Sequence, residues 1–250
     1  MTSVLEKSKL VPCTACPLRR LPIFKPNTRE EVAFIEGMRT AQVDIRASET
    51  IVREGQNSPP LYSVFSGWAF RYKTLSDGRR QILNFLLPGD LIGFQAHMLD
   101  DAAHGVEALT DVRLCQHARG KIWTLYQNYP ELAFDVTWLT AHEERVIDEA
   151  LVSIGRRSAL ERVAMLLLHL FKRARALGLT QGNILDLPVT QQHIADALGL
   201  SLVHTNKTLR RLRKRGLFSL ERQRFELHER GAMEKLADYF EAPVPARPLL

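Results

Sequence analysis

An uninterrupted basic stretch lies between Ala197 and Leu220. It holds no acidic residue and six cations, Lys207, Arg210, Arg211, Arg213, Lys214 and Arg215. Cations grouped in this way can neutralise the phosphates of a nucleic acid, with an affinity that falls as the salt concentration rises. A solvated helix face, or a helix that meets an acidic protein partner, would have the same composition.

Three cysteines are the other candidates for chemistry. Cys13 and Cys16 have the C-x2-C spacing, and Cys115 lies far downstream. Thiolates can ligate a metal or an iron–sulfur cluster, and neighbouring thiols can be oxidised. Three interpretations stay open: a metal or cluster site, a redox-sensing pair, or structural cysteines in a protein controlled by an unidentified small ligand.

The basic stretch belongs to a predicted pair of short helices. Thr190 suits the N-cap of the first helix, Gly199 supplies a turn, and Ser201 suits the N-cap of the second. The residues expected on the buried faces are Ile194, Ala195 and Leu198, then Leu202, Thr205, Leu209 and Leu212. Two short helices joined by a glycine-containing turn are typical of a helix-turn-helix. Apolar and polar residues then alternate along residues 218–227, which predicts a small hairpin, or wing, with Arg222 and Arg224 at its tip.

The helix-turn-helix motif predicts which side chains would contact DNA. The start of its second helix enters the major groove, and the first helix crosses the backbone. Asn206 could pair with adenine, Lys207 with guanine, and Val203 could contact a thymine methyl group. The arginines further on would mostly neutralise phosphates. The predicted DNA-contacting residues are Thr190, Gln191, Gln192, Ser201, Val203, His204, Asn206, Lys207, Arg210, Arg211, Arg213, Lys214 and Arg222.

The first half of the chain has a different pattern. Residues 43–120 consist of short apolar stretches separated by turn signals every 8–12 residues or so, which predicts an all-β sandwich or barrel. Asp77-Gly78 is a good hairpin turn. Charge divides in the same way, since the last 95 residues hold 17 basic and 9 acidic residues and the first 155 hold 17 and 19. A near-neutral module joined to a basic one is therefore expected.

Helical spacing replaces the strand pattern after residue 120. Residues 130–154 predict a long helix with one apolar stripe, and Ala159–Leu177 predicts a second helix that ends before Gly178. The long stripe favours the seam of a symmetric dimer, although it could instead pack on the β domain. The predicted dimerisation residues are Val136, Leu139, Val146, Ile147, Ala150, Leu151 and Ile154.

Together these features resemble the Crp/Fnr family of bacterial transcription regulators, nearer the Fnr branch than the cyclic-AMP-binding branch. The motifs that carry the resemblance, besides the long helix and the winged helix-turn-helix, are Gly67, Asp77-Gly78-Arg79-Arg80-Gln81 and Leu87-Pro88-Gly89-Asp90-Leu91-Ile92-Gly93-Phe94. The resemblance implies an α+β fold with an N-terminal cyclic-nucleotide-binding-like β jelly roll, a long dimerisation helix and a C-terminal winged helix-turn-helix. The expected boundaries are 1–28 for a cysteine-containing segment, 29–128 for the β-roll sensor, 129–155 for the dimerisation helix and 156–250 for the DNA-binding domain.

The same resemblance implies partners and a mode of action. A homodimer would bind a palindromic site in double-stranded DNA, with RNA polymerase as a further partner. Better-known branches have Glu at the position of Val203, Ser or Gly at that of Asn206, and Arg at that of Lys207. The Glu accepts a hydrogen bond from cytosine, which Val203 cannot do. We therefore expect the DNA half-site to differ from the familiar one at that base pair.

The resemblance alone does not tell which signal the β domain senses. Cyclic-AMP-binding members carry an Arg-Ser pair for the phosphate, whereas residues 100–107 here contain Asp100 and Asp101 and no arginine. We therefore expect no binding of cyclic AMP. Fnr-branch members hold an iron–sulfur cluster on four cysteines, three of them spaced C-x2-C-x5-C, but the third of these positions is Pro22. The fourth ligand to Cys13, Cys16 and Cys115 would then have to come from a residue such as His97, His104 or His117.

Other classes of protein find little support. No Walker loop, G-x-S-x-G or H-E-x-x-H motif occurs, and a surface turn explains Asp100, Asp101 and His104 better than a hydrolytic cluster does. We therefore expect no enzyme. No apolar run approaches the roughly 18 residues of a membrane span, and the N-terminus is not a secretory signal. A cytoplasmic protein with reduced thiols and no membrane partner is expected.

Overall fold

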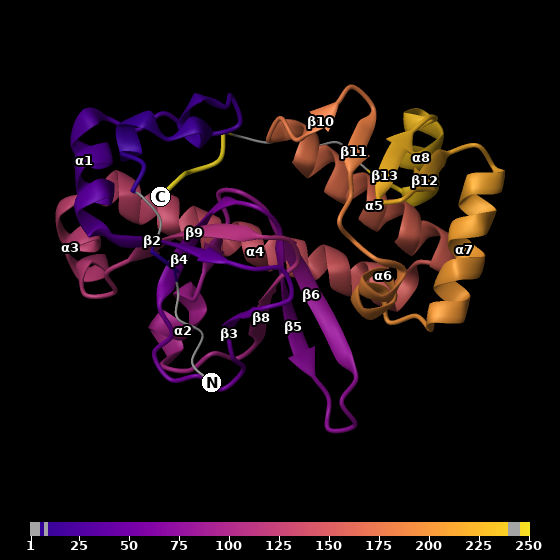
Figure 1. Ribbon diagram of the computed structural model, residues 1–250, viewed down its shortest axis with the longest axis horizontal. Helices are drawn as coiled ribbons and strands as arrows, with labels where there is room; N and C mark the ends of the chain where they lie inside the picture. Colours follow the sequence, from indigo (N-terminus) through magenta and orange to yellow (C-terminus); the bar gives the residue numbers. More distant parts are fainter. Residues whose placement is uncertain (1–5, 8–9, 240–245) are drawn as a thin grey trace. The chain divides into compact units, whose positions relative to one another are not determined.

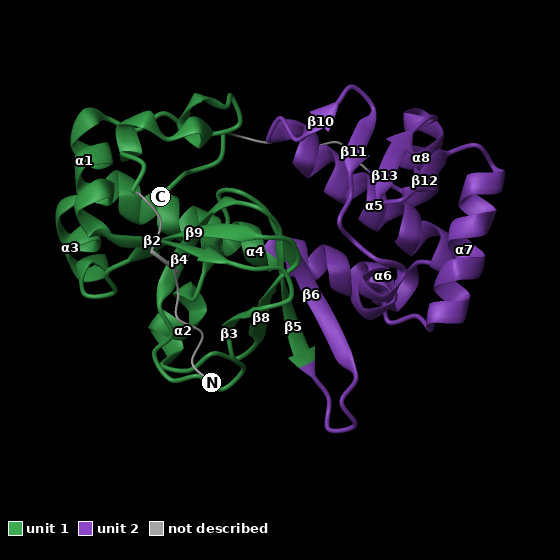
Figure 2. Ribbon diagram, in the orientation of Figure 1, with its two compact units in different colours: residues 1–73, 85–144, 245–250 green, residues 74–84, 145–244 purple. Residues whose placement is uncertain are grey.

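The computed structural model describes residues 6–7, 10–239 and 246–250. It divides into two compact units, coloured separately in Figure 2: unit 1 comprises residues 1–73, 85–144 and 245–250, and unit 2 comprises residues 74–84 and 145–244. None of the described helices combines the length and the apolarity that crossing a membrane requires.

Unit 1 is built on a β-roll. The strands of this β-roll are β1 (Glu6–Lys7), β2 (Arg39–Ile45), β3 (Thr50–Val52), β4 (Leu61–Ser66), β5 (Ala69–Thr74), β6 (Arg80–Leu86), β7 (Leu91–Ile92), β8 (Gly105–Ala108) and β9 (Val112–His117). Residues 80–84 of β6 group with unit 2, and the other strands lie in unit 1 apart from Thr74 at the end of β5. The strands form one sheet in the order β1-β2-β9-β4-β7 and another in the order β3-β8-β5-β6 (Figure 1). Alternating apolar residues such as Val64, Val106 and Leu114 are buried in a shared core. The all-β sandwich or barrel predicted from the turn spacing is confirmed, and so is the cyclic-nucleotide-binding-like β domain that the resemblance implies.

The predicted hairpin at Asp77-Gly78 is also present. Gly78 takes the left-handed conformation (φ 84°) that the turn requires, and the Asp77 carboxylate accepts the Arg79 backbone N–H at 3.0 Å. This turn joins β5 to β6.

Several helices of unit 1 were not predicted. They are α1 (Arg29–Met38), α2 (Phe94–Leu99) and α3 (Lys121–Asn128), together with two single-turn 3-10 helices, Cys13–Ala15 and Pro17–Arg20. The α1 helix starts at a capping box in which Thr28 and Glu31 satisfy each other's backbone N–H groups. The N-terminal cysteine segment is therefore part of unit 1 rather than a separate module.

The long helix is confirmed as α4 (Pro130–Arg156), but its predicted seam needs a correction. Val136 and Leu139 are buried in the core of unit 1, against residues of α1 and α3, with Leu139 only 3% exposed. These two residues therefore cover the β-roll unit and are not free for a partner. Further along α4, Ile147 is half-exposed and Leu151 is 69% exposed, which leaves that part of the stripe uncovered.

Unit 2 is a winged helical domain. Its helices are α5 (Ala159–Ala176), α6 (Gln191–Leu198), α7 (Leu202–Lys214) and α8 (Arg230–Ala237), and its strands are β10 (Thr180–Gln181), β11 (Ile184–Asp186), β12 (Phe218–Glu221) and β13 (Arg224–Leu227). The strands pair in the order β10-β11-β13-β12. Phe171 of α5 packs against Phe225 of β13, and Phe218 of β12 packs against the same ring. The α5 boundaries match the prediction within one residue.

The grouping into units differs from the expected domains. Residues 74–84, expected in the β-roll sensor, group with unit 2. Residues 130–144 of α4 group with unit 1, and the described residues 246–250 also belong to unit 1 rather than to the DNA-binding domain. The last of these differences arises because Arg247 forms a parallel β-bridge with Phe24, a pairing between distant parts of the chain that local sequence patterns do not reveal.

Candidate nucleic-acid interface and cysteine pocket

The helix-turn-helix is fixed by the caps that the sequence predicted. The Thr190 hydroxyl accepts the His193 backbone N–H, and the Ser201 hydroxyl accepts the His204 backbone N–H, each at 3.2 Å. Gly199 ends α6 in the left-handed conformation, with φ 63°. Ile194, Ala195 and Leu198 are buried as predicted. The two caps orient α6 and α7 but occupy the side chains of Thr190 and Ser201, which were predicted to contact DNA.

The outward face of α7 carries the predicted cations. Lys207, Arg210, Arg211, Arg213, Lys214 and Arg215 are all exposed. Among the described residues, none of these six side chains forms an ion pair with a carboxylate of the chain. The face therefore keeps its positive charge available for an anionic partner.

The start of α7 presents a mixed surface. Val203 is 80% exposed, and His204 is exposed beside it. Asn206 is half-buried, and its Oδ1 is covered without a hydrogen-bond partner among the described residues. A bidentate contact with adenine needs both the amide oxygen and the amide nitrogen. Asn206 would therefore have to change rotamer before it could read adenine.

Two details of the predicted interface differ from expectation. Leu202 was expected to be buried but is 43% exposed, whereas Thr208 is buried in its place. Leu202 is the first residue of α7, and helical side chains point toward the N-terminus, so its side chain projects beyond the helix start. Gln191 is exposed, whereas the Gln192 amide is engaged by Asp196 at 2.7 Å.

The predicted wing is present as β12 and β13. Arg222 and Gln223 form its two-residue turn, with φ values of 45° and 72°. Positive φ at both positions is the geometry of the tight turns that match strand twist. Arg222 and Arg224 are exposed at this end of the hairpin, where they could reach phosphates.

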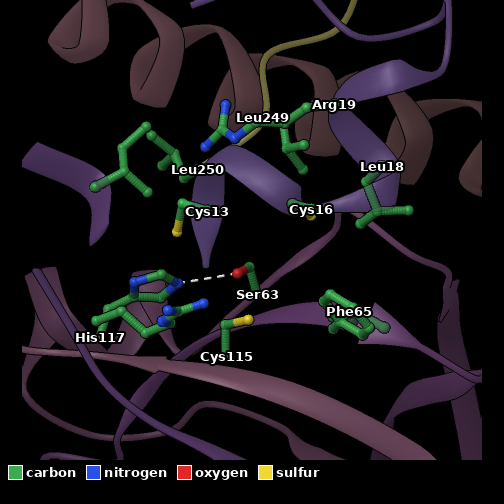
Figure 3. Close-up of a pocket in the computed structure, with 13 residues that line it drawn as sticks. Cys13, Cys16, Leu18, Arg19, Ser63, Phe65, Cys115, His117, Leu249 and Leu250 are labelled. Atoms are coloured by element: carbon green, nitrogen blue, oxygen red, sulfur yellow. Dashed lines mark hydrogen bonds between the residues drawn. The ribbon is translucent and has the colours of Figure 1, made fainter. Parts of the chain in front are cut away.

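The three cysteines converge in unit 1, as Figure 3 shows. Cys13, Cys16 and Cys115 line one small pocket, although they come from the N-terminal segment and from β9. All three thiols are free. His117, two residues beyond Cys115 on the same strand, lines the same pocket, because alternate residues of a strand share a face. His97 and His104, the other two candidate ligands, do not line it.

Hydrogen bonds hold the pocket together. The buried Gln42 accepts the Val11 N–H through Oε1 at 2.8 Å and donates through Nε2 to Cys115 Sγ at 3.4 Å. His117 Nε2 and Ser63 Oγ lie 2.9 Å apart, while His117 Nδ1 is buried with no partner among the described residues. The polar part of this pocket, including Ser63 and Arg39, was missed from the sequence. The Cys115-x-His117 spacing on a strand was the one signal that pointed to it.

Burial dominates the electrostatics of the pocket. It raises the pKa of the Cys13 thiol, and the positive charge of Arg39 and Arg19 offsets this only in part. Burial also raises the pKa of Cys115 against the hydrogen bond from Gln42. Desolvation, assisted by Arg39, lowers the pKa of His117 to about 4. At neutral pH the pocket therefore holds a neutral imidazole, and the Cys13 and Cys115 thiols ionise reluctantly.

These residues do not fit a four-iron cluster. A cubane is normally held by four thiolates, and the position that would supply the fourth is Pro22. The cavity among the cysteines measures about 20 Å³, which is the room for about one water molecule. Among the described residues, no three cysteine, histidine or carboxylate side chains are grouped as metal ligands.

The interior of the β-roll also bears on the expected lack of cyclic-nucleotide binding. Its buried cation is Arg71, which donates two hydrogen bonds to the Glu143 carboxylate and one to the Leu91 carbonyl. A phosphate would have to compete with the carboxylate for this guanidinium. The segment from Asp100 to Glu107 supplies no other arginine.

A β-roll joined by a long helix to a winged helix-turn-helix with a free basic face defines a signal-responsive DNA-binding regulator. Two family models match: the Crp-like helix-turn-helix domain over residues 161–236 and the cyclic nucleotide-binding domain over residues 42–129. The chain belongs to the Crp/Fnr family of transcription regulators. It is therefore a dimeric, sequence-specific DNA-binding protein, as predicted.

Individual relatives agree with this assignment. The chain is 30% identical to the transcriptional activator protein FnrL of Cereibacter sphaeroides, with 85% of this chain and 86% of that protein covered. It is 25% identical to the anaerobic regulatory protein of Pasteurella multocida, with 90% and 82% covered. The solved structure of FixK2 from Bradyrhizobium japonicum matches with a TM-score of 0.70 and 29% identity, over 80% of this chain and 98% of that one. The two named relatives are regulators, in line with this family.

Proposed function

We propose that this regulator reads its DNA with α7 and takes its signal from oxidation of the cysteines in unit 1. The observation that carries the DNA-reading part is the outward face of α7. Its six cations lie behind the exposed Val203 and form no ion pair with a carboxylate of the part of the chain that the structure describes. In a two-fold dimer, the two copies of α7 would read the half-sites of a palindrome in double-stranded DNA. The cations supply affinity, and the start of the helix supplies sequence choice.

Salt dependence tests this reading of DNA. Binding of the full chain to duplex DNA is measured at two salt concentrations, for the unsubstituted protein and for Arg211→Ala. The variant should bind all sequences more weakly and lower the salt slope by about one. Arg175→Ala, which removes an exposed cation of α5 instead, is the matched control and should keep the slope. Binding that does not change with salt would contradict the proposal.

Regulation would act on transcription by contact with RNA polymerase in the cytoplasm. The Cereibacter sphaeroides relative is named a transcriptional activator, which supports activation as the outcome. Transcription in vitro from a promoter that carries the selected site, with and without the protein, measures this directly. A fall in transcription wherever the site is placed in the promoter would contradict activation.

For the signal, thiol chemistry suits the pocket better than a cluster. Cys16 is half-buried and Cys13 is buried. A peroxide would oxidise the Cys16 thiolate to a sulfenic acid and be reduced to water or an alcohol. The Cys13 thiol would then displace water from that sulfenic acid and form a disulfide. The Pasteurella multocida relative, named as an anaerobic regulatory protein, supports a redox signal.

Anaerobic purification separates the two kinds of signal. The thiol mechanism predicts a colourless protein without iron or sulfide, whose DNA affinity changes after peroxide treatment. Cys16→Ser should abolish that change while the affinity of the reduced protein is kept. A brown protein that contains iron and sulfide and bleaches in air would replace the thiol mechanism with a cluster. An affinity that peroxide leaves unchanged would contradict redox control.

A further inference from the structure

The strap, which we define as residues 246–250, is bound to unit 1 by its backbone. The Lys25 N–H donates to the Arg247 carbonyl at 2.8 Å, and the Arg247 N–H donates to the Ile23 carbonyl at 2.6 Å. These two bonds hold the strap beside residues 23–25, which follow closely after Cys13 and Cys16 in the chain. The strap is the short yellow segment at the C label of Figure 1.

A buried ion pair fastens the strap. The Arg247 guanidinium is paired with the Asp90 carboxylate and also donates to the Gly89 carbonyl at 3.2 Å. The two charged side chains are only 11% and 7% exposed. Removing one partner of such a pair leaves the other charge buried and uncompensated, so the pair opposes release of the strap.

The strap then fills one wall of the cysteine pocket. Leu249 is 3% exposed and Leu250 is 8% exposed, and both line the cavity together with the three cysteines (Figure 3). The fit is close: a Cβ added at Gly89 would lie 2.6 Å from Phe24 and 3.6 Å from Leu249. Since the remaining cavity has room for about one water, the strap is part of what keeps solvent and reagents from the thiols.

We propose that the strap is a gate, and that the buried thiol of Cys13 and the half-buried thiol of Cys115 react with an oxidant only after the strap leaves the pocket. This inference rests on the proposed function only in that Cys13 belongs to the thiol pair that carries the signal. The strap also continues the chain beyond α8 of unit 2.

Alkylation of the reduced full chain by iodoacetamide tests the gate. Rates are measured for each cysteine by mass spectrometry, without DNA and without oxidant. Arg247→Ala should accelerate alkylation of Cys13 and Cys115 by roughly ten- to hundredfold, the factor that corresponds to losing charged hydrogen bonds from the closed state. Lys73→Ala, which removes an exposed ion pair with Glu54 in the same unit, is the matched control and should leave both rates unchanged.

A second variant guards against general unfolding. Leu249→Ala keeps the ion pair and removes part of the plug, so it should also accelerate Cys13 and Cys115 while the circular dichroism stays unchanged. Folded variants with unaltered alkylation rates would overturn the gate. The gate predicts that, in the unsubstituted protein, the alkylation rate of Cys13 follows the hydrogen exchange of the Lys25 and Arg247 backbone amides. An alkylation rate that instead follows global unfolding as urea is added would also overturn the gate. Failure of peroxide to change DNA affinity would affect the proposed signal alone, because alkylation is measured independently.

Discussion

Arg71 and Glu143 are joined by two charged hydrogen bonds, 2.8 Å from Nη1 to Oε2 and 2.7 Å from Nη2 to Oε1. Arg71 lies in β5 and is buried, and Glu143 lies on α4 shortly before its residues pass from unit 1 to unit 2 at Arg145. The Leu91 carbonyl accepts a third bond from the same guanidinium at 2.6 Å. The β-roll thus holds α4 through a buried charge as well as through apolar packing.

Removing the charge of Glu143 should loosen this attachment. Glu143→Gln keeps the size of the side chain but leaves Arg71 buried without its counter-charge, so the free energy of unfolding should fall by about 2–3 kcal/mol. Tryptophan fluorescence during urea unfolding measures this for unit 1 alone, because Trp68, Trp123 and Trp138 all belong to it. Glu144→Gln changes an exposed neighbour and should shift stability by less than about 0.5 kcal/mol. Equal effects of the two variants would show that the pair does not hold α4.

Val203 should determine one base pair of the DNA site. Its exposed side chain can make only apolar contact, whereas a carboxylate there could accept a hydrogen bond from cytosine. Val203→Glu should shift the half-site selected from random DNA at that position, by about 1–3 kcal/mol in preference. Arg213→Ala is the control, since a phosphate contact should weaken all sequences alike. Selection of one identical site by Val203→Glu and the unsubstituted protein would contradict this role.

Two leucines of α4 should respond differently to a charge. Leu151 is 69% exposed within one chain, so Leu151→Asp should leave the fold intact and convert the dimer to a monomer with lost operator binding. Leu139 is 3% exposed in the core of unit 1, so Leu139→Asp should destabilise that unit by several kcal/mol. Sedimentation gives the oligomeric state, and tryptophan fluorescence reports the folding of unit 1. A folded Leu151→Asp dimer would place the seam elsewhere.

The contrast between these leucines illustrates what the sequence could supply. Helical periodicity predicts the length of α4 and its apolar stripe, because spacing of three and four residues is a local property. It does not tell which part of the stripe meets the same chain and which part stays uncovered. That division depends on α1 and α3 and on their contacts with α4, which join parts of the chain that are far apart in sequence.

In the candidate sites too, local features were predictable from the sequence and contacts between distant parts of the chain were not. The caps at Thr190 and Ser201, the turn at Gly199 and the cations of α7 were predictable because each acts within a few residues. The grouping of Cys13, Cys16, Cys115 and His117 was only partly predictable, since it needs the N-terminal segment to lie against β9. The strap at Arg247 was not predictable, because its partners Asp90 and Ile23 are far away in sequence.

His117 should make the stability of unit 1 depend on pH. Its pKa in the folded protein is lowered to about 4 by burial, assisted by repulsion from Arg39, whereas the unfolded chain has the ordinary value near 6.5. Between these values the unfolded state binds the proton and the folded state resists it. The stability contribution is therefore complete above about pH 6.5 and is lost progressively as the pH falls toward 4. The loss from this residue is on the order of 3 kcal/mol.

His117→Gln tests this dependence because glutamine does not titrate and can still reach Ser63, the partner of His117 Nε2. Urea unfolding between pH 4.5 and pH 7.5, followed by tryptophan fluorescence, should show a flatter profile for this variant. His104, whose pKa burial also lowers to about 4, would account for the slope that remains. His204→Gln changes an exposed residue of unit 2, which contains no tryptophan, and should leave the profile of unit 1 unchanged. An unchanged slope in His117→Gln would mean that the pocket admits the proton, and hence that it is less closed than the position of Leu249 and Leu250 implies.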